Sequence, residues 1–86
     1  KYNRKLISAK VFEIEYFKNN QKEEIIWFAT NKGVFLINLS KKYQLDFEEK
    51  NGLSSNFVSS IEIINNEIWF GTSSGLCRFN WINNLK

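Results

Sequence analysis

The residue types that usually carry catalysis are scarce in this chain of 86 residues. It has no histidine and a single cysteine, Cys77. Histidine is the commonest general base and a frequent metal ligand, and a zinc site is built from several Cys or His ligands. The composition therefore argues against a histidine-dependent active site, a zinc site of usual composition and an internal disulfide. We expect no catalytic residue, no metal and no cofactor in this segment.

Two pairs of adjacent carboxylates are the remaining candidates for acid–base chemistry: Glu23/Glu24 and Glu48/Glu49. Neighbouring residues of a strand point to opposite faces. Such a pair is poorly placed to flank one glycosidic bond, as the two carboxylates of a glycosidase do. We interpret both pairs as solvent-facing residues of turns and strand ends. The sequence also has nothing that resembles a glycine-rich phosphate-binding loop.

Three tryptophans could stack on a sugar ring. Trp27 and Trp69 occupy two copies of one apolar motif, "IIWFAT" at 25–30 and "EIWFGT" at 67–72. A strand that is apolar on both faces is covered on both faces, so we expect these two indoles to pack in a core. Trp81 has no counterpart in the first copy, and it is the freer candidate for contact with a ligand or another chain.

The motif belongs to an internal repeat that fills most of the chain. Six residues recur 42 positions later: Ile26, Trp27, Phe28, Thr30, Gly33 and Asn38 return as Ile68, Trp69, Phe70, Thr72, Gly75 and Asn80. Upstream of the motif the offset is 47, because "KNNQKEE" gives the first copy an insertion of five residues. Self-similarity at a period of about 20 to 50 residues indicates a repeat architecture.

Each copy reads as a series of strands joined by tight turns. The apolar and β-branched stretches predict strands at 10–17, 25–30, 34–39 and 43–48, and again at 57–64, 67–72 and 76–81. No window shows a helical periodicity. The turn "NN" at 65–66 is a hairpin signal because Asn tolerates a positive φ, and we expect positive φ at Gly33 and Gly75.

Repeats of this length with four antiparallel strands are typical of β-propeller blades. We therefore predict an all-β fold of about two four-stranded antiparallel blades, the last lacking its outer strand. Blade one would span about 6–48 and blade two about 53–86. Closure of a propeller takes roughly four to eight blades, and the chain begins at Lys1 rather than Met, so we expect a partial propeller from a longer protein.

Composition excludes several other classes. A hydrophobic content of 43% argues against disorder, and no apolar run approaches the roughly 18 residues of a membrane span. The net charge of +3 comes from 12 basic and 9 acidic residues along the chain. Its one basic concentration, within residues 1–10, is interpreted as a solvated terminal segment, so we expect no nucleic-acid partner.

The second copy resembles a known repeat. "NGLSSNFVSSIEIINNEIWFGTSSGLCRFN" at 51–80 is similar to the two-component regulator propeller repeat, in which Gly-Leu precedes an Ile-rich strand, a Trp-(Ile/Phe)-Gly-Thr motif and a second Gly-Leu. The first copy departs from it at Ala29, which replaces the motif glycine, and in its insertion. The resemblance covers about residues 6–81. WD40 and kelch repeats fit less well, because the chain lacks histidine and a paired glycine.

The resemblance implies a segment of the periplasmic or extracytoplasmic sensor region of a membrane-bound histidine kinase, often a hybrid kinase. Its partners would be an oligosaccharide or another small extracellular ligand, and neighbouring blades or further copies; a membrane would be involved only through the parent protein. Ligands of propellers usually meet loops at a channel entrance. The residues that could line one rim are Asn31, Lys32, Ser55, Asn56, Ser73 and Ser74, with Trp81 as a further contact.

Two other functions remain open at this point. One is a self-assembling lectin-like or protein-interaction module, in which several short chains complete one propeller. The other is part of a propeller-type glycan-active enzyme, with its catalytic residues on other blades. Catalytic His or carboxylate residues elsewhere in a parent chain would favour the enzyme, and a membrane span followed by a kinase would favour the sensor.

Overall fold

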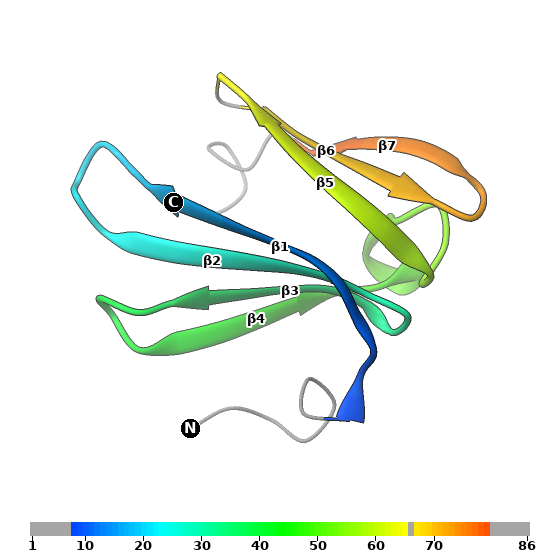
Figure 1. The fold of residues 1–86 in the computed structure, drawn as a ribbon, viewed down its shortest axis with the longest axis horizontal. Coiled ribbons are helices and arrows are strands. Elements are labelled where there is room, and N and C mark those ends of the chain that lie inside the picture. The colour runs from blue at the N-terminus through cyan, green and yellow to red at the C-terminus, as the bar shows by residue number, and fades with distance from the viewer. Residues whose placement is uncertain (1–7, 66, 80–86) are drawn as a thin grey trace.

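The computed structural model describes residues 8–65 and 67–79, and they form two antiparallel β-sheets (Figure 1). The first sheet contains β1 (Val11–Lys18), β2 (Glu24–Thr30), β3 (Gly33–Asn38) and β4 (Tyr43–Phe47). The second contains β5 (Val58–Ile64), β6 (Glu67–Thr72) and β7 (Gly75–Phe79), and the single turn of 3-10 helix η1 (Glu49–Asn51) lies between the sheets in sequence. In both sheets the strand order follows the chain.

The predicted all-β class is confirmed, and the ends of the first six strands lie within one residue of the predicted positions. The last strand, expected at 76–81, begins at Gly75 and is described to Phe79; Trp81 lies outside the described residues. Gly33 and Gly75 have φ of 105° and 113°, and Asn65 has φ of 55°. These are the positive values that the turn sequences predict, because glycine and asparagine adopt them at low cost.

The sequence repeat is also a structural repeat. The β1–β2 ladder shifts register between Val11 and Glu13, and the β5–β6 ladder shifts between Val58 and Ser60. Each residue of the first bulge lies 47 positions before its counterpart in the second, which is the offset found in the sequence. The two copies therefore share strand order, register and an irregularity of the ladder.

The two sheets pack face to face, mainly through β5 against β1 and β2. Trp27 is fully buried between them, with its ring centroid 6.3 Å from Phe47 and 6.0 Å from Phe70. The core consists of Ile25, Trp27, Ala29, Val34, Leu36, Leu53, Val58, Ile61, Ile68 and Phe70. Cys77 packs against this core, as its apolar surroundings in the sequence indicate.

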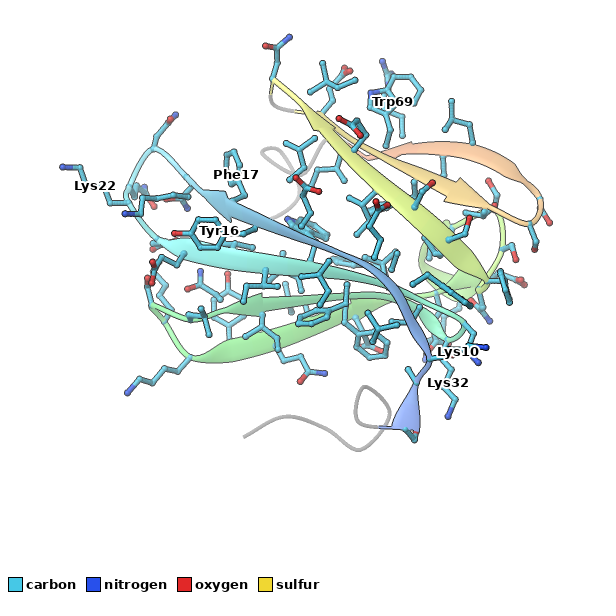
Figure 2. All side chains as sticks on the ribbon, in the orientation of Figure 1. Lys10, Tyr16, Phe17, Lys22, Lys32 and Trp69 are labelled. Atoms are coloured by element: carbon cyan, nitrogen blue, oxygen red, sulfur yellow. The ribbon has the colours of Figure 1, made fainter. Side chains whose placement is uncertain are left out.

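The expectation that both tryptophans pack in the core is wrong for Trp69. Trp69 is half-buried and lies on the opposite side of the second sheet (Figure 2), where the Arg78 guanidinium is 5.8 Å from the ring centroid. The reason is geometric. Trp27 and Trp69 point to equivalent sides of their sheets. Among the described elements, the second sheet covers the Trp27 side of the first sheet, whereas no sheet covers the Trp69 side of the second.

Candidate functional site

The candidate residues within the described chain gather at one end of the molecule. The β2–β3 turn, the β6–β7 turn and the connector of residues 49–57 lie together on the right of Figure 1, whereas the β1–β2, β3–β4 and β5–β6 turns lie at the other end. We call the first group the connector rim. It brings together six of the predicted residues: Asn31, Lys32, Ser55, Asn56, Ser73 and Ser74.

The two hairpin turns of the rim are built in the same way. In the β2–β3 turn, the Thr30 hydroxyl donates to the carbonyl of Gly33 at 2.8 Å and accepts from the backbone N–H of Lys32 at 2.9 Å. In the β6–β7 turn, the Thr72 hydroxyl makes the equivalent bonds to Gly75 and Ser74 at 2.7 and 3.1 Å. The recurring threonines therefore fix the backbone of both turns through the same pair of hydrogen bonds.

Ser55 and Asn56 tie the connector to both turns. The hydroxyls of Ser55 and Ser73 lie 2.7 Å apart, and Ser55, which is buried, also accepts from the backbone N–H of Phe57. The carbonyl of Asn56 accepts from the backbone N–H of Gly33 at 2.6 Å. Its side-chain Oδ1 accepts from the N–H of Glu49, whose carboxylate in turn accepts from the N–H of Asn56. Both residues hold the rim together.

Asn31 and Lys32 connect the rim to the start of β1. The Asn31 side-chain oxygen accepts from the backbone N–H of Lys10 at 2.8 Å, and the Asn31 N–H donates to the Lys10 carbonyl at 3.1 Å. The Lys32 ammonium donates to the Ser8 hydroxyl at 2.9 Å. Lys10 and Lys32 consequently lie near one another (Figure 2), and they give this part of the rim a positive charge.

An aromatic pair beside these lysines was not predicted from the sequence. Phe12 and Phe57 are both exposed and their ring centroids are 5.0 Å apart, with the Lys10 ammonium 5.9 Å from the centre of the Phe12 ring. The carbonyl of Phe57 accepts from the backbone N–H of Ser73, which joins the pair to the β6–β7 turn. The two phenylalanines are 45 positions apart, and only their place at the starts of equivalent strands could have indicated the contact.

The connector rim presents side-chain groups of several chemical kinds. It combines an exposed aromatic surface with amide and hydroxyl groups and two ammonium groups. Aromatic rings offer an apolar face to a ligand, and Asn and Ser side chains both donate and accept hydrogen bonds. Across residues 8–65 and 67–79, no three Asp, Glu or Cys side chains converge as metal ligands would.

The carboxylates of Glu23 and Glu24, at the opposite end, have different partners. The interpretation of this pair as solvent-facing is wrong for Glu23, whose side chain is only 15% exposed. Glu23 forms an ion pair with Lys41 at 3.0 Å and accepts from the side-chain amides of Asn19 and Asn38. Hydrogen bonding to Lys41 is the largest cause that lowers the pKa of Glu23. Glu24 instead accepts from the Tyr16 hydroxyl at 2.9 Å, and this bond raises the pKa of Tyr16. The two carboxylates thus have separate structural partners.

Comparisons of the chain with protein-family models, with curated proteins and with solved structures found no match. In the described part of the chain, no helix has the length and apolar character that a membrane crossing requires.

Proposed function

We propose that this chain supplies two consecutive blades of a β-propeller in the extracytoplasmic, ligand-sensing region of a two-component sensor histidine kinase. One observation carries the proposal: the two sheets repeat each other in strand order, register and turn hydrogen bonding, and they pack face to face. Successive propeller blades are related in this way. The resemblance of residues 51–80 to the two-component regulator repeat supports the sensing role, in which the segment acts as a scaffold with no chemistry of its own.

We assign ligand binding to the connector rim, and we propose an oligosaccharide as the ligand. A sugar presents C–H faces that suit the exposed pair Phe12 and Phe57, and hydroxyl groups that suit Asn31, Ser73 and Ser74. Lys10 and Lys32 favour an acidic sugar over a neutral one. A binding site for a small molecule usually combines an apolar surface with a small number of polar groups.

The test is a titration of the ¹⁵N-labelled 86-residue chain with two hexasaccharides, a neutral glucan and an acidic galacturonan, followed by NMR. We expect the acidic probe to shift the amides of Asn31, Phe57 and Ser73, and Phe57→Ala to weaken binding about tenfold, as loss of a central aromatic contact does. Leu39→Ala, at the β3–β4 turn of the opposite end, is the control and should bind normally. Shifts spread evenly over the chain, or none at millimolar probe, would overturn the assignment.

A further inference from the structure

The outer side of the second sheet carries exposed apolar side chains. Leu76 is 67% exposed and Ile64 is 49% exposed. Trp69 is half-buried, and the Arg78 guanidinium lies over its ring. The strand register places one set of residues on this side, because residues that are paired across an antiparallel ladder share a face. We call this set the Trp69 face: Ser60, Glu62, Ile64, Glu67, Trp69, Leu76 and Arg78.

The Trp69 face is the repeat equivalent of a face that is already packed. By the offsets of 42 and 47, Trp69 corresponds to Trp27, Leu76 to Val34 and Ile64 to Phe17. Trp27 and Val34 are 0% exposed, and Phe17 packs against the core between the sheets. The same positions therefore bury a sheet–sheet contact in the first copy and face solvent in the second.

The charged residues of the Trp69 face also have equivalents on the packed face of the first sheet. Glu62 is paired with Trp69 across the ladder as Glu15 is paired with Trp27. Glu15 lies on the packed side of the first sheet and is only partly exposed. Glu67 and Arg78 neutralise one another through an ion pair at 3.2 Å. The charges on this face are thus compatible with a packed sheet above it.

The outer side of the first sheet offers the complementary surface. The second sheet presents Ile61, Ile68 and Phe70 to Trp27, and their counterparts in the first sheet are Ile14, Ile26 and Phe28. Ile61 is 3% exposed, whereas Ile14 is 57% exposed. Phe35 and Ile37 of β3 share this side of the sheet but are buried, so only its β1–β2 half is open to a partner. We call this half the Ile14 face: Ile14 and Tyr16, which are exposed, and Ile26 and Phe28, which are partly exposed. By repeat position, the Trp69 face and the Ile14 face thus correspond to the two sides that meet within one chain, where β5 packs on β1 and β2.

We propose that the Trp69 face binds the Ile14 face of a second copy of this chain, head to tail. Trp69 then packs on Phe28 of the second copy, as Trp27 packs on Phe70 within the chain. The contact is heterologous, so further copies add in one direction and form a ring or a filament. This inference rests on the repeat geometry alone, and it does not depend on the sensing role or on the connector rim.

The experiment measures the solution mass of the 86-residue chain by light scattering between about 10 and 500 µM, a range suited to weak interfaces. We expect the wild-type mass to rise with concentration. Leu76→Glu blocks the Trp69 face and Ile14→Glu blocks the Ile14 face, so each variant alone should stay monomeric. Mixed in equal amounts, they should form one heterodimer and nothing larger, since each retains the face that the other lacks.

Leu39→Glu is the control and should associate like the wild type, because Leu39 is an exposed apolar residue (38%) that belongs to neither face. Far-UV circular dichroism establishes that each variant is folded, and Ile64→Glu replaces Leu76→Glu if the latter unfolds. A wild-type chain that stays monomeric throughout, or an Ile14→Glu variant that self-associates like the wild type, would overturn the proposal. Because the readout is mass, it is independent of oligosaccharide binding at the rim.

Discussion

The indole of Trp27 packs against the ring of Phe70 with 6.0 Å between their centroids, and this contact joins the two sheets at their centre. Phe70 corresponds to Phe28 of the first copy, and Phe28 lies on the face of its sheet opposite to Trp27. The contact therefore joins the tryptophan face of the first sheet to the opposite face of the second. An indole in this place contributes much of the interface, because a large aromatic side chain buries more apolar area than any other residue type.

Replacement of Trp27 by alanine should therefore destabilise the chain far more than the same change at Trp69. Emptying a buried tryptophan site costs about 3 to 5 kcal/mol, whereas Trp69 loses mainly its contact with Arg78, worth about 0.5 to 1 kcal/mol at an exposed site. Urea unfolding of the two variants at a concentration where the wild type is monomeric measures both. Equal losses would mean that Trp27 does not hold the sheets together.

The two turn glycines should differ in their tolerance of alanine. Both have positive φ, which strains an L-residue by about 1 to 3 kcal/mol. At Gly33 an added Cβ would also collide with the carbonyl oxygen of Phe47, whereas at Gly75 it would meet nothing within 4 Å. We expect Gly33→Ala to lower the free energy of unfolding clearly more than Gly75→Ala in the same urea experiment. The reverse order would contradict the packing of β4 against this turn.

The Glu13 carboxylate should protect one backbone amide of the second sheet. Its Oε1 accepts from the N–H of Ile61 at 2.7 Å, so a side chain of β1 holds the backbone of β5. Glu13→Ala removes this bond, at a cost of about 1 kcal/mol, and should speed hydrogen exchange of the Ile61 amide about fivefold more than that of other β5 amides. Glu13→Gln keeps an acceptor oxygen and should restore most of the protection. Unchanged exchange in both variants would exclude this role.

The Glu23 cluster should make stability depend on acid pH. Lys41, Asn19 and Asn38 hold the pKa of Glu23 below its ordinary value of 4.5 in the folded chain. A carboxyl group with a lowered folded-state pKa stabilises fully above its unfolded-state pKa, and this contribution is lost as pH falls through the folded-state value. Thermal unfolding between pH 7 and pH 3 should therefore show a smaller acid loss for Glu23→Gln than for wild type. An identical pH profile would count against the ion pair in solution.

Much of the fold is predictable from the sequence because the repeat is strong. The apolar stretches around Trp27 and Trp69 give the inner strands, and Gly33 and Gly75 give the turns that close their hairpins. Two further turns carry no such signal. Lys22 and Lys42 adopt φ of 63° and 60° although lysine rarely does.

Their causes lie in hydrogen bonds that the sequence does not reveal. Asn19 accepts from the backbone N–H of Lys22 through its carbonyl and from those of Gln21 and Glu23 through its side chain. The carbonyl of Asn38 likewise accepts from the N–H of Lys42. These bonds hold the turns where neither glycine nor asparagine occupies the left-handed position.

The candidate site was predictable in place but not in detail. Equivalent turns of equivalent hairpins must lie at the same end, which is why Asn31 and Ser73 share the connector rim. The sequence could not separate Ser55, which is buried and bonded within the rim, from the exposed Ser74. It also could not place Trp69, whose exposure depends on whether another sheet covers it rather than on its own strand.

The bulges at Val11–Glu13 and Val58–Ser60 occupy the same place in both copies. Each sheet of the repeat has its own strand register and bulge, and it carries both of the faces that join one sheet to the next. A gene segment that encodes one sheet can therefore be duplicated or deleted, and the sheets on either side still meet through the same kind of contact. The number of such units can therefore change in one recombination event. Point mutations in the exposed turns can then diversify each unit separately, so architecture and recognition evolve by different genetic routes.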